Sequence, residues 1–286
     1  MNNNKKELIN QIIKSKELFI AYNASASYLY IDEENRSWIF TKKENAEKIV
    51  EDLKQNNSYI RMGEINPHNK SVILSELHRL GIEEVVVDKG TLDTVIERNE
   101  IIPPQSFDNI LEENIPVTNP KIQNFIIRYF QNLNNKNKYE GKDEEIIKLQ
   151  ENLFKEIVNG KFIIPIKVEN KLVSETEGDK VEVKRKSAIT CIASVTNKAG
   201  EKWLPVFTDW FEFRKVFDVN EWSGNVVDYD EIVLLSNANS GAVINCAGIS
   251  VNLNDANKKE IEKYKKNVNY LTESYWQLMH KVLLLS

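Results

Sequence analysis

The sequence contains few of the residues from which disulfide frameworks and metal sites are built. It has two cysteines and three histidines among 286 residues. A disulfide framework needs more cysteines, so Cys191 and Cys246, which lie in apolar strand-like stretches, are predicted to be buried thiols in a reducing compartment. Because the two are far apart in the sequence and no histidine lies near either of them, no zinc site is expected.

Catalytic motifs are missing as well. The sequence contains no HExxH, CxxC, GxSxG or GxxxxGK[ST] pattern. Its histidines, His68, His78 and His280, lie apart from other candidate catalytic residues, and surface or capping roles are expected for them. The acidic run 32–34 falls in a turn, where we expect solvation, and the run 228–231 precedes a helix, whose dipole favours acidic residues at its start. We therefore expect a non-enzymatic protein with no catalytic residues, no metal and no cofactor.

Long apolar segments and a strongly basic face are also absent. No apolar run approaches about 18 residues, so no transmembrane helix is expected, and no apolar stretch accompanies the basic residues at the start, so no signal peptide is predicted. Residues 1–118 contain 14 Lys or Arg and 20 Asp or Glu, a net charge of −6, whereas residues 119–286 contain 24 and 23, a net charge of +1. Neither part is basic enough to neutralise several phosphates. The sequence predicts a cytoplasmic protein that binds neither nucleic acid nor a membrane.

What the sequence does contain is an internal repeat. The segment Trp38–Thr41 and the segment Trp203–Asp209 each complete an apolar strand and precede an amphipathic helix. Around both segments the order of elements is the same: a helix, an apolar strand, the segment itself, a helix, and a strand after a glycine. Such a repeat predicts two units that each bury their own apolar face, and the chain length suggests about two domains.

The first half is predicted to alternate helices and strands. Its strands are expected at 17–22, 27–31, 38–40, 59–62 and 82–87. The second and third of these are predicted to pair across the polar turn 32–36. Thr41 and Glu44 are expected to form a capping box at the start of the next helix, and Gly81 is expected to end a helix that begins near Val72.

Prolines are concentrated in the middle of the chain. The elements predicted after them repeat the order of the first half. Four prolines between residues 101 and 120 predict an irregular linker, followed by helices at 120–133 and 143–158. Strands are expected at 162–166, 188–195, 203–207, 226–227, 242–245 and 249–253. The third of these is predicted to pair with the second, and Thr208 or Asp209 is expected to cap a helix. The charged segment 169–186 predicts a mobile hairpin tip, and residues 255–284 predict a long final helix.

These elements predict an α/β or α+β fold class with two similar small domains. Each domain is expected to contain a mixed sheet with flanking helices. The domains are predicted at 1–102 and 143–286, the second with the long C-terminal helix, and residues 103–142 are predicted to be a linker with a connecting helix.

Three segments of the second half resemble a known family. They are Phe162–Ile166, Trp203–Asp209 and Ser240–Asn245, which together make residues 160–254 similar to the N-terminal domain of the SseB family, bacterial proteins linked to enhanced serine sensitivity. The first half resembles a diverged copy, which keeps Phe40-Thr41 and Gly81 but lacks the Pro, the Asp and the Asn. The resemblance implies small α/β domains that act as binding or regulatory modules, and it supplies no catalytic residues.

Aromatic residues gather at the strand–helix junction of the second half. They are expected to form a core between helix and sheet, or alternatively a groove for a partner, because exposed aromatic side chains dominate the energetics of interfaces. Trp210, which directly follows Asp209, is the best candidate for exposure. The candidate partner-binding residues are Trp203, Phe207, Asp209, Trp210, Trp222 and Asn245.

The leading hypothesis is a non-catalytic, cytoplasmic protein–protein interaction or regulatory module of the SseB type. It would recognise an unknown protein partner through a sheet edge or the aromatic start of a helix, and it would be a monomer or a weak homo-oligomer. Two alternatives remain open. One is a regulator of a sulfur- or serine-metabolism enzyme, or a small-molecule binder, which should show a polar pocket with perturbed pKa values. The other is an immunity-like protein that neutralises a secreted toxin, which an acidic first half would suit.

Overall fold

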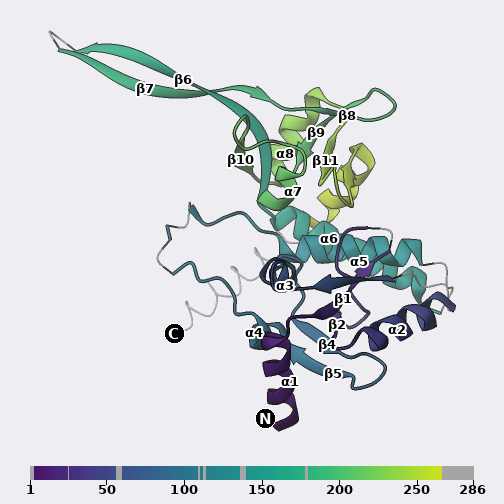
Figure 1. Cartoon of the computed structure of the whole chain (residues 1–286). Coiled ribbons are helices and arrows are strands. Elements are labelled where there is room, and N and C mark those ends of the chain that lie inside the picture. The colour runs from purple at the N-terminus through teal and green to yellow at the C-terminus, as the bar shows by residue number, and fades with distance from the viewer. Residues whose placement is uncertain are drawn as a thin grey trace, which may run out of the picture. The chain divides into compact units, whose positions relative to one another are not determined.

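The chain folds into two compact units (Figure 1). The first contains one mixed five-stranded sheet, and the second contains a three-stranded antiparallel sheet and a four-stranded mixed sheet. The computed structural model describes residues 3–265, apart from 25, 56–59, 109, 112–113, 136–139 and 178–179. The first unit comprises the described residues up to Ile115 and those of 119–153, and the second comprises 116–118 and the described residues from Phe154 onward. The fold class is α+β, as the sequence predicted.

The first unit is built on a five-stranded sheet with the order β3-β1-β2-β4-β5. Its strands are β1 (Leu18–Asn23), β2 (Arg36–Phe40), β3 (Ile60–Ile65), β4 (Glu84–Val87) and β5 (Thr94–Glu97). β1 is antiparallel to β2 and β3, β2 is parallel to β4, and β4 is antiparallel to β5. The central strands are buried almost throughout, which explains why they read as continuous apolar runs rather than as alternating ones.

Five helices of the first unit surround this sheet. They are α1 (Asn3–Lys14), α2 (Lys43–Gln55), α3 (Lys70–Arg79), α4 (Arg98–Ile101) and α5 (Pro120–Asn134). The helix α2 places Ala46, Ile49 and Val50 on the core of the sheet, as its spacing predicted. The helix α3 ends at Arg79 with Leu80 as its C-cap, and Gly81, the predicted helix terminator, follows with a φ of 63° that suits a residue without a Cβ.

Two local predictions for the first unit are wrong. Residues 27–31 do not form a strand that pairs with 38–40. Instead β2 pairs with β1, and within 27–31 only Leu29 forms a bridge, to Tyr22. The predicted capping role of Thr41 is also wrong, because α2 begins at Lys43 and the hydroxyl of Thr41 donates to Asp88 on another strand end. Both errors came from treating local pairing as sufficient when more distant residues supply the partners.

The second unit repeats the topology of the first. Its strands are β6 (Phe162–Glu177), β7 (Lys180–Ile192), β8 (Val195–Thr196), β9 (Lys202–Val206), β10 (Ser223–Val227), β11 (Ala242–Ile244) and β12 (Val251–Leu253). β10 is antiparallel to β6, β11 is parallel to β9, and β12 is antiparallel to β11. Ile163 and Phe207 connect β6 to the end of β9 through two backbone hydrogen bonds of 2.9 Å. The order β10-β6-β9-β11-β12 therefore matches β3-β1-β2-β4-β5 in sequence and direction.

The helices of the second unit are shorter than their counterparts. They are α7 (Trp210–Arg214), α8 (Tyr229–Leu235) and a 3-10 turn (Ser236–Ala238), while α6 (Lys142–Asn159) runs from the first unit into the second. Residues 255–265 are helical, and the remainder of the predicted final helix lies outside the described residues.

A long two-stranded ribbon has no counterpart in the first unit. β6 and β7 are paired from Ile166 and Ile192 to Glu177 and Lys180, with one register shift between Lys167 and Val168, so the predicted hairpin is present and extends beyond the rest of its unit (Figure 1). The prediction that 188–195 pairs as a whole with 203–207 is wrong. Only Val195 and Thr196 of that stretch pair with β9, because residues up to Ile192 belong to β7.

Candidate functional site

The polar residues selected from the sequence of the second unit meet where β9 and β11 end. These parallel strands end side by side, with Val206 opposite Ile244. Asn245 follows β11 with a φ of 54°, in a region that asparagine tolerates better than most residues. Its Oδ1 accepts a hydrogen bond from the amide of Thr208 at 3.1 Å, and its Nδ2 donates to the Thr208 hydroxyl at 3.0 Å. Both residues are buried, so Asn245 ties the two strand ends together.

The neighbouring Asp209 caps the helix that follows. Its Oδ1 accepts a hydrogen bond from the amide of Glu212 at 2.8 Å, which satisfies one of the free donors at the start of α7. Its Oδ2 also lies 3.4 Å from the hydroxyl of Thr208. Asp209 is only 4% exposed. The sequence predicted this cap, and the burial shows that the carboxylate serves the fold.

The first unit has the same junction at the ends of β2 and β4. Asp88 has a φ of 51°, and its carboxylate accepts hydrogen bonds from the amide of Thr41 at 2.9 Å and the hydroxyl of Thr41 at 2.6 Å. The side chain of Asn45 on α2 donates to the same carboxylate at 3.2 Å. The first copy lacks the asparagine, as expected, and Asp88 occupies the equivalent position.

An aromatic cluster fills the space between α7 and the sheet of the second unit. Phe213 lies at its centre, with ring centroids 5.4 Å from Phe207, 5.1 Å from Trp210 and 5.5 Å from Phe217. Trp222 extends the cluster through an edge contact with Phe217 at 5.2 Å. Phe207 and Phe213 are fully buried. The structural interpretation of these aromatic residues therefore holds for the centre of the cluster.

The rim of this cluster remains accessible. Trp210 is half-buried instead of exposed, because its indole packs over Gly224 on β10, where a Cβ would approach the ring to 2.5 Å. Trp222 is also half-buried, with the ammonium of Lys167 over its ring at 4.8 Å. Such cation–π contacts hold a charged group beside an aromatic surface that still faces water.

Phe211 is an exposed residue that sequence reasoning did not select. It is 44% exposed, and the ammonium of Lys215 lies 5.0 Å from its ring centroid. Helical spacing could have indicated this exposure. Trp210, Phe213 and Phe217 are three and four residues apart and face the core, whereas Phe211 does not lie on the same face of the helix. Val216 and Val219, 39% and 47% exposed, follow it in the chain. We call Phe211, Val216 and Val219, with the accessible parts of Trp210 and Trp222, the aromatic rim.

The last of the selected residues, Trp203, lies at a different position. It begins the apolar part of β9, is half-buried, and covers Gly241, where a Cβ would approach the ring to 2.9 Å. Its indole N–H is buried and has no hydrogen-bond partner in the described structure. Of the six selected residues, Trp210 and Trp222 lie on the aromatic rim, Phe207 lies beneath it, Asp209 and Asn245 hold the junction, and Trp203 packs elsewhere on the sheet.

The cysteines differ from the prediction. Cys191 is exposed and Cys246 is half-buried, and both are free thiols. Burial raises the pKa of Cys246, and the nearby carboxylate of Glu212 raises it further, although a backbone hydrogen bond opposes this. A raised pKa keeps the thiol protonated and unreactive at neutral pH.

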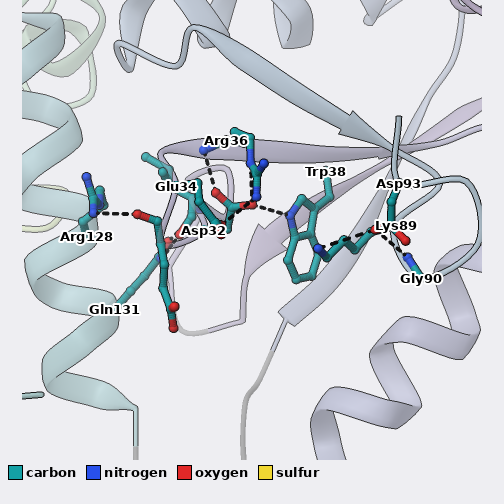
Figure 2. A network of polar contacts seen from close by, with 11 residues as sticks. Asp32, Glu34, Arg36, Trp38, Lys89, Gly90, Asp93, Arg128 and Gln131 are labelled. Atoms are coloured by element: carbon teal, nitrogen blue, oxygen red, sulfur yellow. Dashed lines mark hydrogen bonds and ion pairs between the residues drawn. The ribbon is translucent and has the colours of Figure 1, made fainter. Parts of the chain in front are cut away.

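A polar network organises the loop before β2 in the first unit (Figure 2). Asp32 is 6% exposed, so the expectation of a solvated acidic turn is wrong for this residue. Its carboxylate accepts hydrogen bonds from the backbone of Arg36 at 2.7 Å and from the indole of Trp38 at 2.9 Å. Gln131 on α5 pairs with both backbone groups of Ile31, so α5 fixes the loop from the other side.

An acidic pocket of about 430 Å³ lies open on the first unit. Its lining includes Glu34, Glu83, Glu84, Glu97 and Arg98. Arg98 donates to the carbonyl of Ile82 at 2.9 Å, and burial lowers its pKa even though Glu83 raises it. The pocket therefore has an acidic wall and a partly buried cation.

Comparisons with known proteins yield no relative for this chain. No protein-family model matches the sequence, no curated protein matches it, and no solved structure matches the fold. Within the part of the chain that the structure describes, no group of three or more His, Cys, Asp or Glu residues is arranged to hold a metal ion. No described helix is long and apolar enough to cross a membrane.

Proposed function

We propose that the chain is a non-catalytic, cytoplasmic interaction or regulatory module of the SseB type, and that it binds a protein partner through the aromatic rim of its second unit. The proposal is supported by the difference between the two copies of the fold. Asp209 precedes α7 as Lys42 precedes α2, so Trp210 and Phe211 occupy the positions of Lys43 and Glu44. The first unit forms the same junction and the same helix start with two charged residues there.

The fold therefore accounts for one of the two aromatic residues only. Trp210 fills the space over Gly224, whereas Phe211 is exposed and packs beside Lys215. Placing a large aromatic side chain in water has no benefit for folding, and aromatic anchors are the residues that contribute most to protein–protein binding. Phe211, Val216 and Val219 are each exposed and lie within nine residues of chain, and exposed apolar residues are what an interaction module requires.

The test is affinity capture with a matched control. The full chain, the variant Phe211→Glu and the variant Leu92→Glu would each be used as bait, with captured proteins identified by mass spectrometry. Leu92 is 60% exposed in the first unit, so its substitution makes the same chemical change away from the rim. We expect one partner to be retained by the wild type and by Leu92→Glu and to be lost by Phe211→Glu. Equal capture by all three baits would contradict the proposal.

The acidic pocket of the first unit favours a second candidate function, an immunity-like protein that neutralises a secreted toxin. Its lining contains four glutamates and one arginine. Glu34 is already ion-paired with Arg36 at 2.6 Å, so the other three carboxylates would attract a basic partner. The variant Glu97→Lys should then lose a basic partner that Phe211→Glu retains. Retention of that partner by Glu97→Lys, at unchanged salt, would remove the support for this candidate.

A further inference from the structure

The strand β10 has an open outer edge. It is the end strand of its sheet and pairs with β6 alone among the described strands (Figure 1). On β6, the backbone of Ile163 exchanges two hydrogen bonds of 2.9 Å with Phe207, and the carbonyl of Pro165 accepts one from the amide of Ala193 at 3.0 Å. Ile163 and Pro165 therefore direct their backbone groups away from β10, because the backbone groups of alternate residues in a strand point to opposite edges.

The open edge consists of the backbone groups of Gly224 and Val226. These residues lie opposite the two β6 residues that point away from β10, whereas Asn225 between them faces a residue that bonds to β10. No described residue bonds to the outward groups of Gly224 and Val226. The strand contains no charged residue, and Val226 is 49% exposed. An unpaired edge of this kind is a template for another strand.

Two other edge strands are closed by side chains. In the first unit, Glu64 of β3 occupies the position of Val226 in the register of the two sheets. Its side chain is exposed, and its carbonyl accepts a hydrogen bond from the side chain of Asn69 at 3.1 Å. On β12, the carbonyl of Asn252 accepts one from the side chain of Asn257 at 2.6 Å. Charged and capped edges resist pairing with another strand, and within the described part of the chain β10 has neither protection.

We propose that a second copy of this chain pairs with β10, so that the two β10 strands run antiparallel about a two-fold axis at Asn225. In this register Gly224 of each copy lies opposite Val226 of the other copy. Because both residues direct their backbone groups outward, each of these two pairs exchanges backbone hydrogen bonds. The sheets of the two copies become continuous, and the interface is self-complementary, as a two-fold interface must be.

The side chains of β10 favour this register. Gly224 has no side chain, so Val226 of one copy fits opposite it, beside the indole of Trp210 that covers the glycine of the other copy. The two Asn225 side chains meet on the axis, at a pair whose Cα atoms lie about 4.5 Å apart in antiparallel sheets. Asn225 is half-buried, and its side chain has no hydrogen-bond partner among the described residues. Because an amide both donates and accepts, the two amides satisfy each other.

Charges at the ends of the paired segment also fit this register. Trp222 of each copy comes opposite Asp228 of the other, and the ammonium of Lys167 lies 4.8 Å from the ring centroid of Trp222. The register thus brings a cation of one copy toward a carboxylate of the other at both symmetry-related ends. The ladder stops there, because the amides of Trp222 and Asp228 already donate to the carbonyl of Asp218 and the carboxylate of Glu231, each at 2.9 Å.

Sedimentation equilibrium of the purified full chain tests the interface. The wild type should self-associate in a concentration-dependent way. Val226→Glu copies Glu64, the residue at the closed edge of the first unit, and should weaken self-association by about tenfold or more, because it places a charge at both symmetry-related contacts. Leu92→Glu makes a matched change at an exposed position of the first unit and should associate as the wild type does.

A cysteine on the two-fold axis tests the register. In a Cys191→Ser background, which removes the exposed native thiol, Asn225→Cys brings two thiols together at a Cα separation that a disulfide allows. Mild oxidation should therefore produce a covalent dimer. Ser223→Cys is the matched control on the same strand. Its two copies lie about 13 Å apart along the strands, four residues from each other across the axis, and should not form a disulfide.

Three results would overturn the proposal. They are a wild-type chain that stays monomeric at every concentration, self-association of Val226→Glu equal to that of the wild type, and a disulfide that forms through Ser223→Cys but not through Asn225→Cys. The cross-linking result keeps the proposal testable if Val226→Glu fails to fold. All of these measurements use the purified chain without a captured partner, so their failure is distinct from a failure of partner binding through the aromatic rim.

Discussion

The two units of this protein solve the same folding problem with different residues. In both, the parallel strands at the centre of the sheet end at a threonine that is held by a residue with positive φ on the neighbouring strand. In the first unit that residue is Asp88, and in the second it is Asn245. The first junction holds one carboxylate, from Asp88, and the second also holds one, from Asp209. The repeat therefore conserves the number of carboxylates at the threonine while their position changes.

Core packing also differs between the units, because large and small residues exchange places at equivalent positions. The small Ala46 of α2 occupies the position of Phe213 in α7, so the helix of the first unit adds small and aliphatic residues to its core and the helix of the second adds aromatic rings. On the edge strands the sizes reverse, because Met62 of β3 occupies the position of Gly224 in β10. A large residue on one element is matched by a small one on the other. The comparison teaches that the topology sets volumes and hydrogen bonds, and that several sets of residues satisfy it.

The largest expected effect on the free energy of unfolding comes from removing the central ring of the aromatic cluster. Phe213→Ala should destabilise the second unit by about 3–5 kcal/mol, because it leaves a cavity among rings that cannot collapse. Denaturant unfolding followed by tryptophan fluorescence checks this, provided the transitions of the two units are resolved. Phe211→Ala, at the exposed neighbour, is the control and should cost about 1 kcal/mol or less. Equal effects of the two substitutions would contradict the described packing.

The reversal of sizes can be tested by moving one residue between the copies. Gly224→Met introduces the first unit's residue under the indole of Trp210 and should cost about 1–3 kcal/mol through overpacking. Trp210→Lys with Gly224→Met reproduces the first unit's pair and should recover part of that loss, because sites in contact are coupled. A double-mutant cycle on the free energy of unfolding measures the coupling. Strict additivity would show that the two positions are not in contact.

Exchanging Asp88 and Asn245 between the two junctions should have unequal effects on stability. Asn245→Asp places a second carboxylate at the threonine hydroxyl that Asp209 already approaches, so we expect a loss of about 1–3 kcal/mol. Asp88→Asn copies the second unit's arrangement, in which an amide faces the hydroxyl, and should cost about 1 kcal/mol or less. Chemical denaturation of both variants provides the comparison. A larger loss for Asp88→Asn would show that the two junctions are not equivalent.

The smallest expected effect is a pH dependence of the free energy of unfolding, to which His78 of the first unit contributes. Burial lowers the pKa of His78 in the first unit below its ordinary value of 6.5, although its contact with the carbonyl of Ile102 opposes the shift. The neutral form is favoured in the folded state, so this contribution is present above pH 6.5 and is lost as the pH falls through the lowered pKa. The acid side of the stability profile should become shallower in His78→Gln. An unchanged profile would show that His78 does not contribute.

Much of the fold could be predicted from the sequence, because local patterns of apolar residues indicate its strands and helices. The apolar runs of β1, β4 and β6 and the spacing of α2 placed these elements correctly, and the repeat of Phe-Thr indicated two similar units. The junction was only half predictable. Asp209 and Asn245 were selected, but Asp88 was missed, because its equivalence to Asn245 depends on strand register rather than on residue identity.

Exposure was the property that the sequence predicted least well. Asp32 was expected in water and is buried, because the indole of Trp38 and the backbone of Arg36 satisfy its carboxylate. Trp210 was expected to be exposed and instead covers Gly224, a contact between residues that are 14 positions apart. In both cases the partner lies on a strand outside the residue's own turn or helix, so exposure depends on how these elements pack.

The most direct test of the central claim is hydrogen exchange on the full chain with and without the captured partner. If the copies share a fold and only the second has acquired a binding surface, amide exchange in residues 210–222 should become slower when the partner is bound. Exchange in α2, the equivalent helix of the first unit, should remain unchanged. Protection of α2 or of the acidic pocket, with residues 210–222 unaffected, would contradict that claim.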